Sequence, residues 1–236
     1  MYSFESAIRY SEIDEAGELT LTGLVNYFQD CSTFQSEAIG LGLKWLEKEE
    51  RAWLLLAWQI EVLRYPKFTE NIRTCTWASD FKKVYGSRNF VMETRDKETL
   101  AFANSIWVYL DTKEGRPARA PLEVIERYSS EPPYPMEYMP RKIEIPVTDN
   151  SEKLDDIPIQ KHHLDTNGHV NNSQYVQMAL DCADAHKKPK KLRMEYKKSA
   201  IFGDVLMPRR FRLNEKLWIS LSGADNTNYA IAELVF

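Results

Sequence analysis

Residues 161–181, KHHLDTNGHVNNSQYVQMALD, repeat the pattern of residues 10–30, YSEIDEAGELTLTGLVNYFQD, when the two are aligned without gaps. A second match lies farther along, where IEVLRYPKFTENI at 60–72 aligns with MEYKKSAIFGDVL at 194–206. Two matches in the same order indicate an internal duplication with one deletion in the second copy. The identical positions are Asp14 and Asp165, Gly17 and Gly168, Val25 and Val176, Asp30 and Asp181, Glu61 and Glu195, and Phe68 and Phe202.

Each copy is predicted to contain one amphipathic helix followed by strands. Apolar residues recur at helical spacing after each polar turn. They are Leu24, Val25, Phe28, Cys31 and Phe34 in the first copy, and Tyr175, Val176, Ala179 and Leu180 in the second. Alternating runs such as ENIRTCTWASDF at 70–81 and KLWISLSG at 216–223 indicate strands joined by short turns. The sequence therefore predicts an α+β fold in which an antiparallel sheet curls around a central helix, built twice.

The prolines divide the chain. Eight of the eleven lie within residues 117–158. Proline removes a backbone donor and fixes φ, so this density is typical of a connector. We therefore predict a first domain at 1–120, a linker at 121–158 that leaves room for a local helix near 122–128, and a second domain at 159–236.

The composition is that of an ordinary globular protein, with 43% apolar residues, 28% charged residues and a net charge of −4. A net-acidic chain without a basic, aromatic-rich motif does not favour nucleic acid or an anionic membrane as a partner. The apolar run AWLLLAW at 52–58 is too short to span a bilayer, and the first residues lack the apolar segment of a signal peptide. The scattered Cys31, Cys75 and Cys182 are typical of reduced thiols. We expect a soluble, cytoplasmic protein without a membrane span.

Three of the four histidines, His162, His163 and His169, lie near Asp165, and this cluster allows three interpretations. A metal site is disfavoured because the spacing does not suit helical ligation and no second ligand pair completes it, so we predict no metal and no cofactor. A capping turn fits the Asp, Asn, Thr and Gly content, with the helix cap among residues 171–173. Proton-transfer chemistry is the third interpretation.

Comparison of the two copies favours chemistry in the second. The aspartate and the glycine of the turn recur in both copies, which indicates that they are part of the architecture. Asn167 and His169 do not recur, because Ala16 and Glu18 occupy those positions in the first copy. A purely structural turn has similar needs in both copies, so the imidazole and the amide indicate a catalytic duty for the second turn.

The segment DTNGHVNNSQYV at 165–176 resembles the D-x-N-x-H-V-N-N segment of plant-type and bacterial acyl-acyl carrier protein (acyl-ACP) thioesterases. The resemblance extends to the opening segment at 10–30, the W-x-I-E strand at 58–61 and the strand MEYKKSAIFGD at 194–204. It implies a tandem hotdog fold and hydrolysis of fatty acyl-ACP to free fatty acid, ending fatty-acid synthesis. The family's catalytic residues fall on Asp165, Asn167 and His169.

One departure concerns the attacking water. Members of the family often carry a glutamate, followed in plants by cysteine, in the segment EYKKSAIFGD, where this chain has Ser199 and Ala200. A cysteine nucleophile is therefore not supported. Glu195 is a candidate substitute, because strand alternation puts residues 195, 197 and 199 on one face. Ser199 and the backbone N–H groups around Gly168 are further candidates for positioning the water or stabilising the oxyanion.

The resemblance also implies a receptor for the acyl chain in the first half. Its large apolar residues are candidates for the lining, although most such residues simply form a core: Phe28, Phe34, Trp45, Trp53, Leu55, Trp58 and Trp77. Eleven Lys or Arg face only four acids within residues 183–216, which suits either an acidic partner, the acyl carrier protein, or a solvated basic loop. Either a monomer or a homodimer is compatible with a tandem hotdog.

Two other functions stay open on the sequence. An acyl-CoA thioesterase of the same fold would use the same residues on a different carrier. A non-catalytic acyl-binding protein would explain the missing glutamate, but the joint presence of Asp165, Asn167 and His169 argues against it.

Overall fold

The computed structural model describes residues 1–147, 150–185 and 187–236. The chain forms two compact units. The first comprises Met1–Leu56 and Ile60–Met139, and the second comprises Ala57–Gln59 and Pro140–Phe236. The change from one unit to the other at Met139 falls inside the proline-rich stretch, where few regular elements form because proline lacks the backbone donor.

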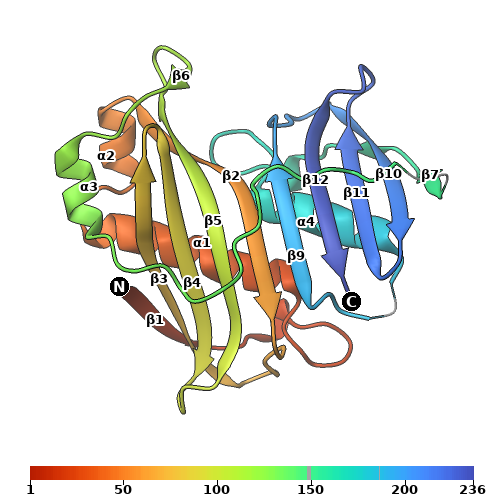
Figure 1. The fold of residues 1–236 in the computed structure, drawn as a ribbon, viewed down its shortest axis with the longest axis horizontal. Helices are drawn as coiled ribbons and strands as arrows, with labels where there is room; N and C mark the ends of the chain where they lie inside the picture. The colour runs from red at the N-terminus through yellow and green to blue at the C-terminus, as the bar shows by residue number, and fades with distance from the viewer. Residues whose placement is uncertain (148–149, 186) are drawn as a thin grey trace. The chain divides into compact units, whose positions relative to one another are not determined.

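The first unit is an antiparallel sheet packed against one long helix, as predicted. The neighbours in the sheet follow the order β1, β3, β4, β5 and β2, with β6 paired to β5. Helix α1 packs on β3 and β1 and lies across this sheet (Figure 1). The elements are β1 (Tyr2–Ala7), η1 (Tyr10–Glu12), α1 (Leu21–Ala38), α2 (Leu43–Lys48), β2 (Arg51–Val62), β3 (Asn71–Lys82), β4 (Tyr85–Thr94), β5 (Thr99–Asp111), β6 (Arg116–Pro117) and α3 (Leu122–Tyr128).

The second unit has the same plan with fewer elements. Its sheet follows the order β9, β12, β11, β10 and β7, with β8 paired to β10, and α4 packs on β11, β10 and β12 (Figure 1). All of the strand pairs within this order are antiparallel. The elements are β7 (Ser151–Lys153), β8 (Ile157–Pro158), η2 (Lys161–His163), α4 (Asn172–Ala183), β9 (Lys191–Tyr196), β10 (Val205–Leu213), β11 (Lys216–Ser222) and β12 (Asn228–Val235).

Side-chain caps fix the start of both long helices. The Thr20 side chain accepts a hydrogen bond from the N–H of Gly23, and the Asn171 side chain accepts one from the N–H of Ser173. Each cap satisfies a backbone donor that has no partner inside the helix. The cap predicted among residues 171–173 is therefore confirmed at Asn171, and each helix begins directly after its polar turn.

The duplication is confirmed by hydrogen bonds that recur at aligned positions. In the first unit the N–H of Leu19, just after the turn, donates to a carbonyl in the segment that follows β2. In the second unit the N–H of Val170 donates to a carbonyl in the segment that follows β9. In the same way, an acidic side chain in each of these segments accepts a backbone N–H three residues before it. The pairs are Leu19 N to Pro66 O at 2.8 Å and Val170 N to Ala200 O at 2.9 Å, and Lys67 N to Glu70 Oε2 at 2.9 Å and Ile201 N to Asp204 Oδ2 at 3.0 Å.

The proline-rich stretch lies against the sheet of each unit. In the first, the indole of Trp77 donates to the carbonyl of Pro132 at 2.9 Å. In the second, Ile143 is buried against Trp218 and Ile231, on strands β11 and β12. The local helix that the linker leaves room for near 122–128 is present as α3. These contacts cover one face of the second unit's sheet, while α4 covers the other.

Candidate active site

The second turn is held together by Asp165. Its Oδ1 atom accepts hydrogen bonds from the N–H of Asn167 at 2.8 Å and from the N–H of His169 at 3.2 Å. Its backbone N–H donates to the His169 carbonyl at 2.7 Å, and its carbonyl accepts from Gly168 at 3.2 Å. Gly168 has φ +75°, a conformation that L-residues rarely adopt and glycine adopts without strain. The side chain of Asp165 thus builds the loop that presents residues 167 and 169.

The first unit contains the same turn. Asp14 Oδ1 accepts from the N–H of Ala16 at 3.0 Å and from the N–H of Glu18 at 3.2 Å, and Gly17 has φ +74°. The prediction that the aspartate and the glycine belong to the architecture is therefore confirmed. The second turn differs from the first in two exposed side chains. It carries the Asn167 amide and the His169 imidazole, where the first turn has a methyl group and a carboxylate.

The functional groups of the second turn are free to meet a ligand. Asn167 and His169 are exposed, and Asp165 is half-buried. Within the part of the chain that the structure describes, neither the His169 imidazole nor the Asp165 Oδ2 atom makes a hydrogen bond. An imidazole, a carboxylate oxygen and an amide therefore stand on one five-residue loop, and an imidazole is a group that can act as a general base toward water.

Ser199 lies next to this turn, because the two residues that follow it pair with the turn. The residue after it, Ala200, accepts a hydrogen bond from the N–H of Val170, and Ile201 forms a β-bridge with His169. The Ala200 N–H donates to the hydroxyl of Tyr175 on α4 at 2.7 Å, which fixes the segment on the helix. Burial raises the pKa of Tyr175 to about 12, so this hydroxyl stays protonated. Ser199 itself is exposed.

Glu195 is not brought to the turn. It lies on β9 between Met194 and Tyr196, and the Tyr196 hydroxyl donates to the carbonyl of Asn172 at the start of α4. Side chains alternate along a strand, so Glu195 faces the opposite side of the sheet. There its buried carboxylate accepts the N–H of Ile143 at 3.0 Å. The Glu195 carboxylate therefore anchors the linker to β9 at Ile143.

The backbone donors of the turn are also engaged. The N–H groups of Asn167, Gly168 and His169 all donate to Asp165. Because each already has an acceptor, the N–H of Gly168 becomes available to an oxyanion only if the loop rearranges. The Asn167 side-chain amide is an exposed donor of this loop.

His163 has a structural role that the sequence does not reveal. Its Nδ1 atom accepts the N–H of Gln160 at 3.0 Å, and in the first unit Glu12 accepts the N–H of Arg9 at 3.0 Å in the same way. Burial and the neighbouring His162 lower the pKa of His163, which favours the neutral form that such an acceptor needs. His163 thus repeats the task of Glu12 in the first turn.

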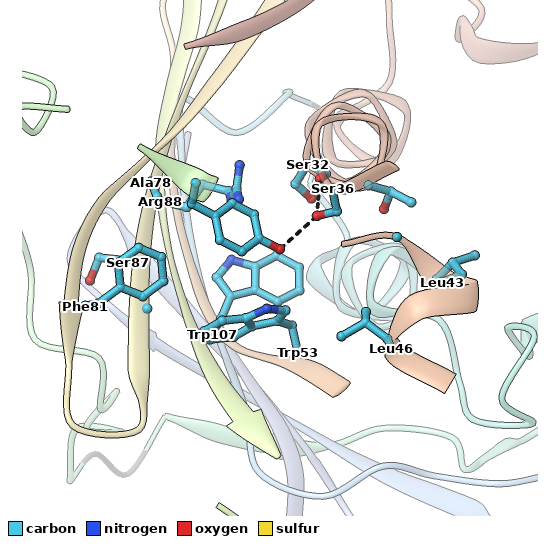
Figure 2. Close-up of a pocket in the computed structure, with 14 residues that line it drawn as sticks. Ser32, Ser36, Leu43, Leu46, Trp53, Ala78, Phe81, Ser87, Arg88 and Trp107 are labelled. Carbon is cyan, nitrogen blue, oxygen red and sulfur yellow. Dashed lines mark hydrogen bonds between the residues drawn. The ribbon is translucent and has the colours of Figure 1, made fainter. Parts of the chain in front are cut away.

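The first unit contains a cavity of about 130 Å³ (Figure 2). Figure 2 shows Ser32 and Ser36 on α1, Leu43 and Leu46 on α2, and the indoles of Trp53 and Trp107 around it. Of the seven apolar residues named as candidates for an acyl slot, Trp53 lines this cavity. Phe28, Leu55, Trp58 and Trp77 are buried in the core, Trp45 packs beside Leu41, and Phe34 is exposed.

Arg88 on β4 also lines the cavity, and it is not among the site residues predicted from the sequence. It shares its side of the strand with Phe90 and Met92, both fully buried. This alternation is the signal that places a charged residue on the core face of the sheet. The Ser36 hydroxyl lies 3.0 Å from the hydroxyl of Tyr128 at the same wall.

Comparison with known proteins identifies the family. Residues 1–128 match the acyl-ACP thioesterase N-terminal domain, and residues 147–227 match the acyl-ACP thioesterase C-terminal domain. The chain belongs to the acyl-ACP thioesterase family. A chloroplastic acyl-(acyl-carrier-protein) hydrolase of Cuphea viscosissima is 26% identical over 194 residues, covering 74% of this chain and 45% of that protein. A palmitoyl-acyl carrier protein thioesterase of Arabidopsis thaliana is 25% identical over 222 residues, covering 85% and 52%.

Solved structures of acyl-ACP thioesterases share the fold. One from Bacteroides thetaiotaomicron is 22% identical, with a TM-score of 0.88 over 99% of this chain and 96% of that one. The 12:0-ACP thioesterase from Umbellularia californica is 17% identical, with a TM-score of 0.83 over 99% and 96%. The fold is the predicted tandem hotdog. The chain spans about half the length of the curated relatives that it matches.

Two features are absent from the part of the chain that the structure describes. Nowhere in residues 1–147, 150–185 and 187–236 do three or more His, Cys, Asp or Glu side chains gather as a metal ion would require. Over the same ranges, no helix has the length and apolar character needed to cross a membrane.

Proposed function

We propose that this chain hydrolyses fatty acyl-ACP to free fatty acid and acyl carrier protein, ending fatty-acid synthesis, by attack of water on the thioester carbonyl. The observation that carries the proposal is that the two turns have the same backbone conformation but different side chains at two aligned positions. Asp165 recurs as Asp14, but Asn167 and His169 stand only in the second turn. Membership of the acyl-ACP thioesterase family supports the same reaction.

In the proposed mechanism His169 takes the proton of the attacking water as the carbon–oxygen bond forms, and returns it to the departing sulfur of the carrier as the carbon–sulfur bond breaks. A positioned general base contributes about 10²–10⁴-fold to the rate. The negative charge of Asp165 stabilises the imidazolium through its Oδ2 atom, since Oδ1 is committed to the turn. The Asn167 amide donates to the thioester oxygen as negative charge develops there, and a donor of this kind is worth about 3 kcal/mol.

In this mechanism Ser199 positions the water. Ser199 is exposed and adjoins Ala200, which pairs with Val170. Its hydroxyl is therefore the candidate for holding the water where relatives have a glutamate. Glu195 is not part of this mechanism, because its carboxylate holds the N–H of Ile143 on the other face of β9.

The acyl carrier protein is the proposed partner. The exposed Lys190 precedes β9 and the exposed Lys191 is its first residue, and a positive surface complements an acidic carrier protein. Attraction of this kind is weakened by salt. We expect KM for an acyl-ACP to rise with ionic strength and KM for the same acyl group on CoA to change less.

The location proposed for this activity is the cytoplasm. Cys31, Cys75 and Cys182 are free and buried, which suits a compartment where thiols stay reduced. Fractionation of the producing cells tests this. Recovery of the protein with membranes or in an oxidising compartment contradicts it.

One assay tests the reaction and the carrier together. Octanoyl-ACP and octanoyl-CoA are each incubated with the protein, and released thiol is followed with a chromogenic disulfide. We expect a higher kcat/KM for octanoyl-ACP. A higher value for octanoyl-CoA makes the protein an acyl-CoA thioesterase instead. Binding of the acyl group without thiol release, across a panel of chain lengths, makes it a non-catalytic acyl-binding protein.

A further inference from the structure

The cavity of the first unit contains a buried guanidinium without a carboxylate partner. Arg88 is 8% exposed, and its Nη1 donates to the Gln35 side chain and, at 3.2 Å, to Thr76 Oγ1. Its guanidinium carbon lies 5.3 Å from the centre of the Tyr128 ring. Within the described part of the chain, no Asp or Glu pairs with Arg88, and its Nε and Nη2 groups donate no hydrogen bond.

This arrangement leaves a positive charge without compensation. Amide and hydroxyl oxygens and an aromatic face satisfy some of the donors but carry no net negative charge. Burial lowers the pKa of Arg88, yet a guanidinium remains charged at neutral pH. Removing an unpaired charge from water is costly, so proteins pair such charges with an anion. Since the chain supplies no carboxylate among its described residues, the anion is expected from a ligand.

The other walls of the cavity select the rest of the ligand. Trp53, Trp107, Phe81 and Leu46 present apolar surface, so the body of the ligand is apolar. The volume of about 130 Å³ is close to the roughly 150 Å³ of a cavity that binds benzene, so it holds about six carbon-sized atoms. The free Nε and Nη2 donors lie on one side of the guanidinium, the fork that matches the two oxygens of a carboxylate.

We propose that this cavity binds an aliphatic carboxylate, with Arg88 holding the carboxylate and the indoles of Trp53 and Trp107 covering the chain. Two sources supply such a group. One is a free fatty acid, the product class of the proposed reaction. The other is an acyl chain that ends in a carboxyl group, which would make Arg88 a specificity-determining residue. The second source rests on the proposed function, but binding of the carboxylate does not.

Binding is measured on the purified full chain by tryptophan fluorescence, because two of the six tryptophans line the cavity. The probes are hexanoate, 1-hexanol and hexylammonium, which share the apolar body and differ in charge. We expect hexanoate to bind at least about tenfold more tightly than 1-hexanol, and hexylammonium to bind most weakly. Equal affinities for hexanoate and 1-hexanol, or no binding of any probe, overturn the proposal.

Variants locate the charge that is responsible. Arg88→Met keeps an unbranched stem and removes the fork, so hexanoate affinity falls at least about tenfold while 1-hexanol affinity stays within about threefold. Arg73→Met is the matched control, since Arg73 pairs with Glu93 at 3.4 Å and does not line the cavity. Unchanged hexanoate binding in Arg88→Met overturns the proposal. If this variant does not fold, the three probes on the unchanged protein still decide it.

A second comparison separates the two sources once hexanoate binding is established. Octanoyl-ACP is compared with the same chain bearing a terminal carboxyl group. A higher kcat/KM for the carboxyl-bearing substrate, lost in Arg88→Met, assigns the carboxylate to the substrate. A lower value assigns it to the free fatty acid. If neither substrate is hydrolysed, the proposed function fails while the hexanoate result stands, so the two failures are distinguishable.

Discussion

Asp165 and Asp14 build the same turn in the two units, so paired substitutions separate folding from catalysis. Each carboxylate accepts two backbone N–H groups, at 2.8 and 3.2 Å around Asp165 and at 3.0 and 3.2 Å around Asp14. These bonds lie at the surface, so each is worth about 0.5–1 kcal/mol. Alanine at either position should therefore lower the free energy of unfolding by about 1–2 kcal/mol, or about 2–8 °C in Tm for a chain of this size.

Asparagine keeps the acceptor and removes the charge. We expect Asp165→Asn and Asp14→Asn to change stability by no more than about 0.5 kcal/mol, because Oδ1 still accepts both N–H groups. Only Asp165→Asn loses the charge next to the proposed base, and its kcat on acyl-ACP should fall at least about 100-fold. Asp14→Asn should keep the activity of the unchanged protein.

The assay combines chemical denaturation with thiol release from octanoyl-ACP, and both variants are measured in the same buffer. The reasoning is refuted if Asp165→Asn keeps kcat within about threefold of the unchanged protein. It is equally refuted if Asp14→Asn loses as much activity as Asp165→Asn, because the asymmetry between the turns would then have no catalytic meaning.

Three further predictions concern the support of the turn. Tyr175→Phe leaves the buried N–H of Ala200 without its acceptor, so the free energy of unfolding should fall by about 1–3 kcal/mol in a denaturant titration; a loss below about 0.5 kcal/mol contradicts this. Gly168→Ala and Gly17→Ala should each cost about 1–2 kcal/mol, because both glycines have positive φ and an added Cβ would meet nothing within 4 Å; clearly unequal losses would mean that the turns differ. The pKa of His163 in the folded state lies below its ordinary value of about 6.5. As pH drops through about 6.5, the unfolded chain therefore binds a proton at this imidazole before the folded chain does, and the free energy of unfolding falls. The fall should be smaller in His163→Gln, and identical pH profiles of unfolding free energy would contradict it.

Much of the fold follows from periodicity in the sequence. Apolar spacing of about 3.6 residues predicts α1 and α4, and alternation predicts β3 and β11, all of which the structure contains. The six-residue helix α2 is not predicted, because so short a segment gives too few turns for a period to show. Its position depends on packing around the buried Leu41 that no local pattern records.

The candidate site, like the fold, could be predicted from the sequence only in part. Comparing the two copies is enough to separate the shared Asp165 from the distinctive His169, since both turns are visible in the sequence. Alternation predicts residues 195, 197 and 199 on one face. The Lys197 ammonium does lie 3.7 Å from the Glu195 carboxylate, but β9 ends at Tyr196, so the alternation does not continue to Ser199, which lies beside the turn. Nor does the pattern say which face of β9 Glu195 occupies. Both faces of this strand are covered, one by α4 and one by the linker around Ile143, so burial gives no direction.

The proposal that the second turn carries out the chemistry is tested most directly by His169→Gln with Glu18→Gln as its matched control. Both residues occupy the same position in a recurring turn, and both backbone N–H groups donate to the turn aspartate. We expect kcat for octanoyl-ACP to fall at least about 100-fold in His169→Gln and to stay within about threefold in Glu18→Gln, with both variants folded. Full turnover by a folded His169→Gln protein would contradict the account.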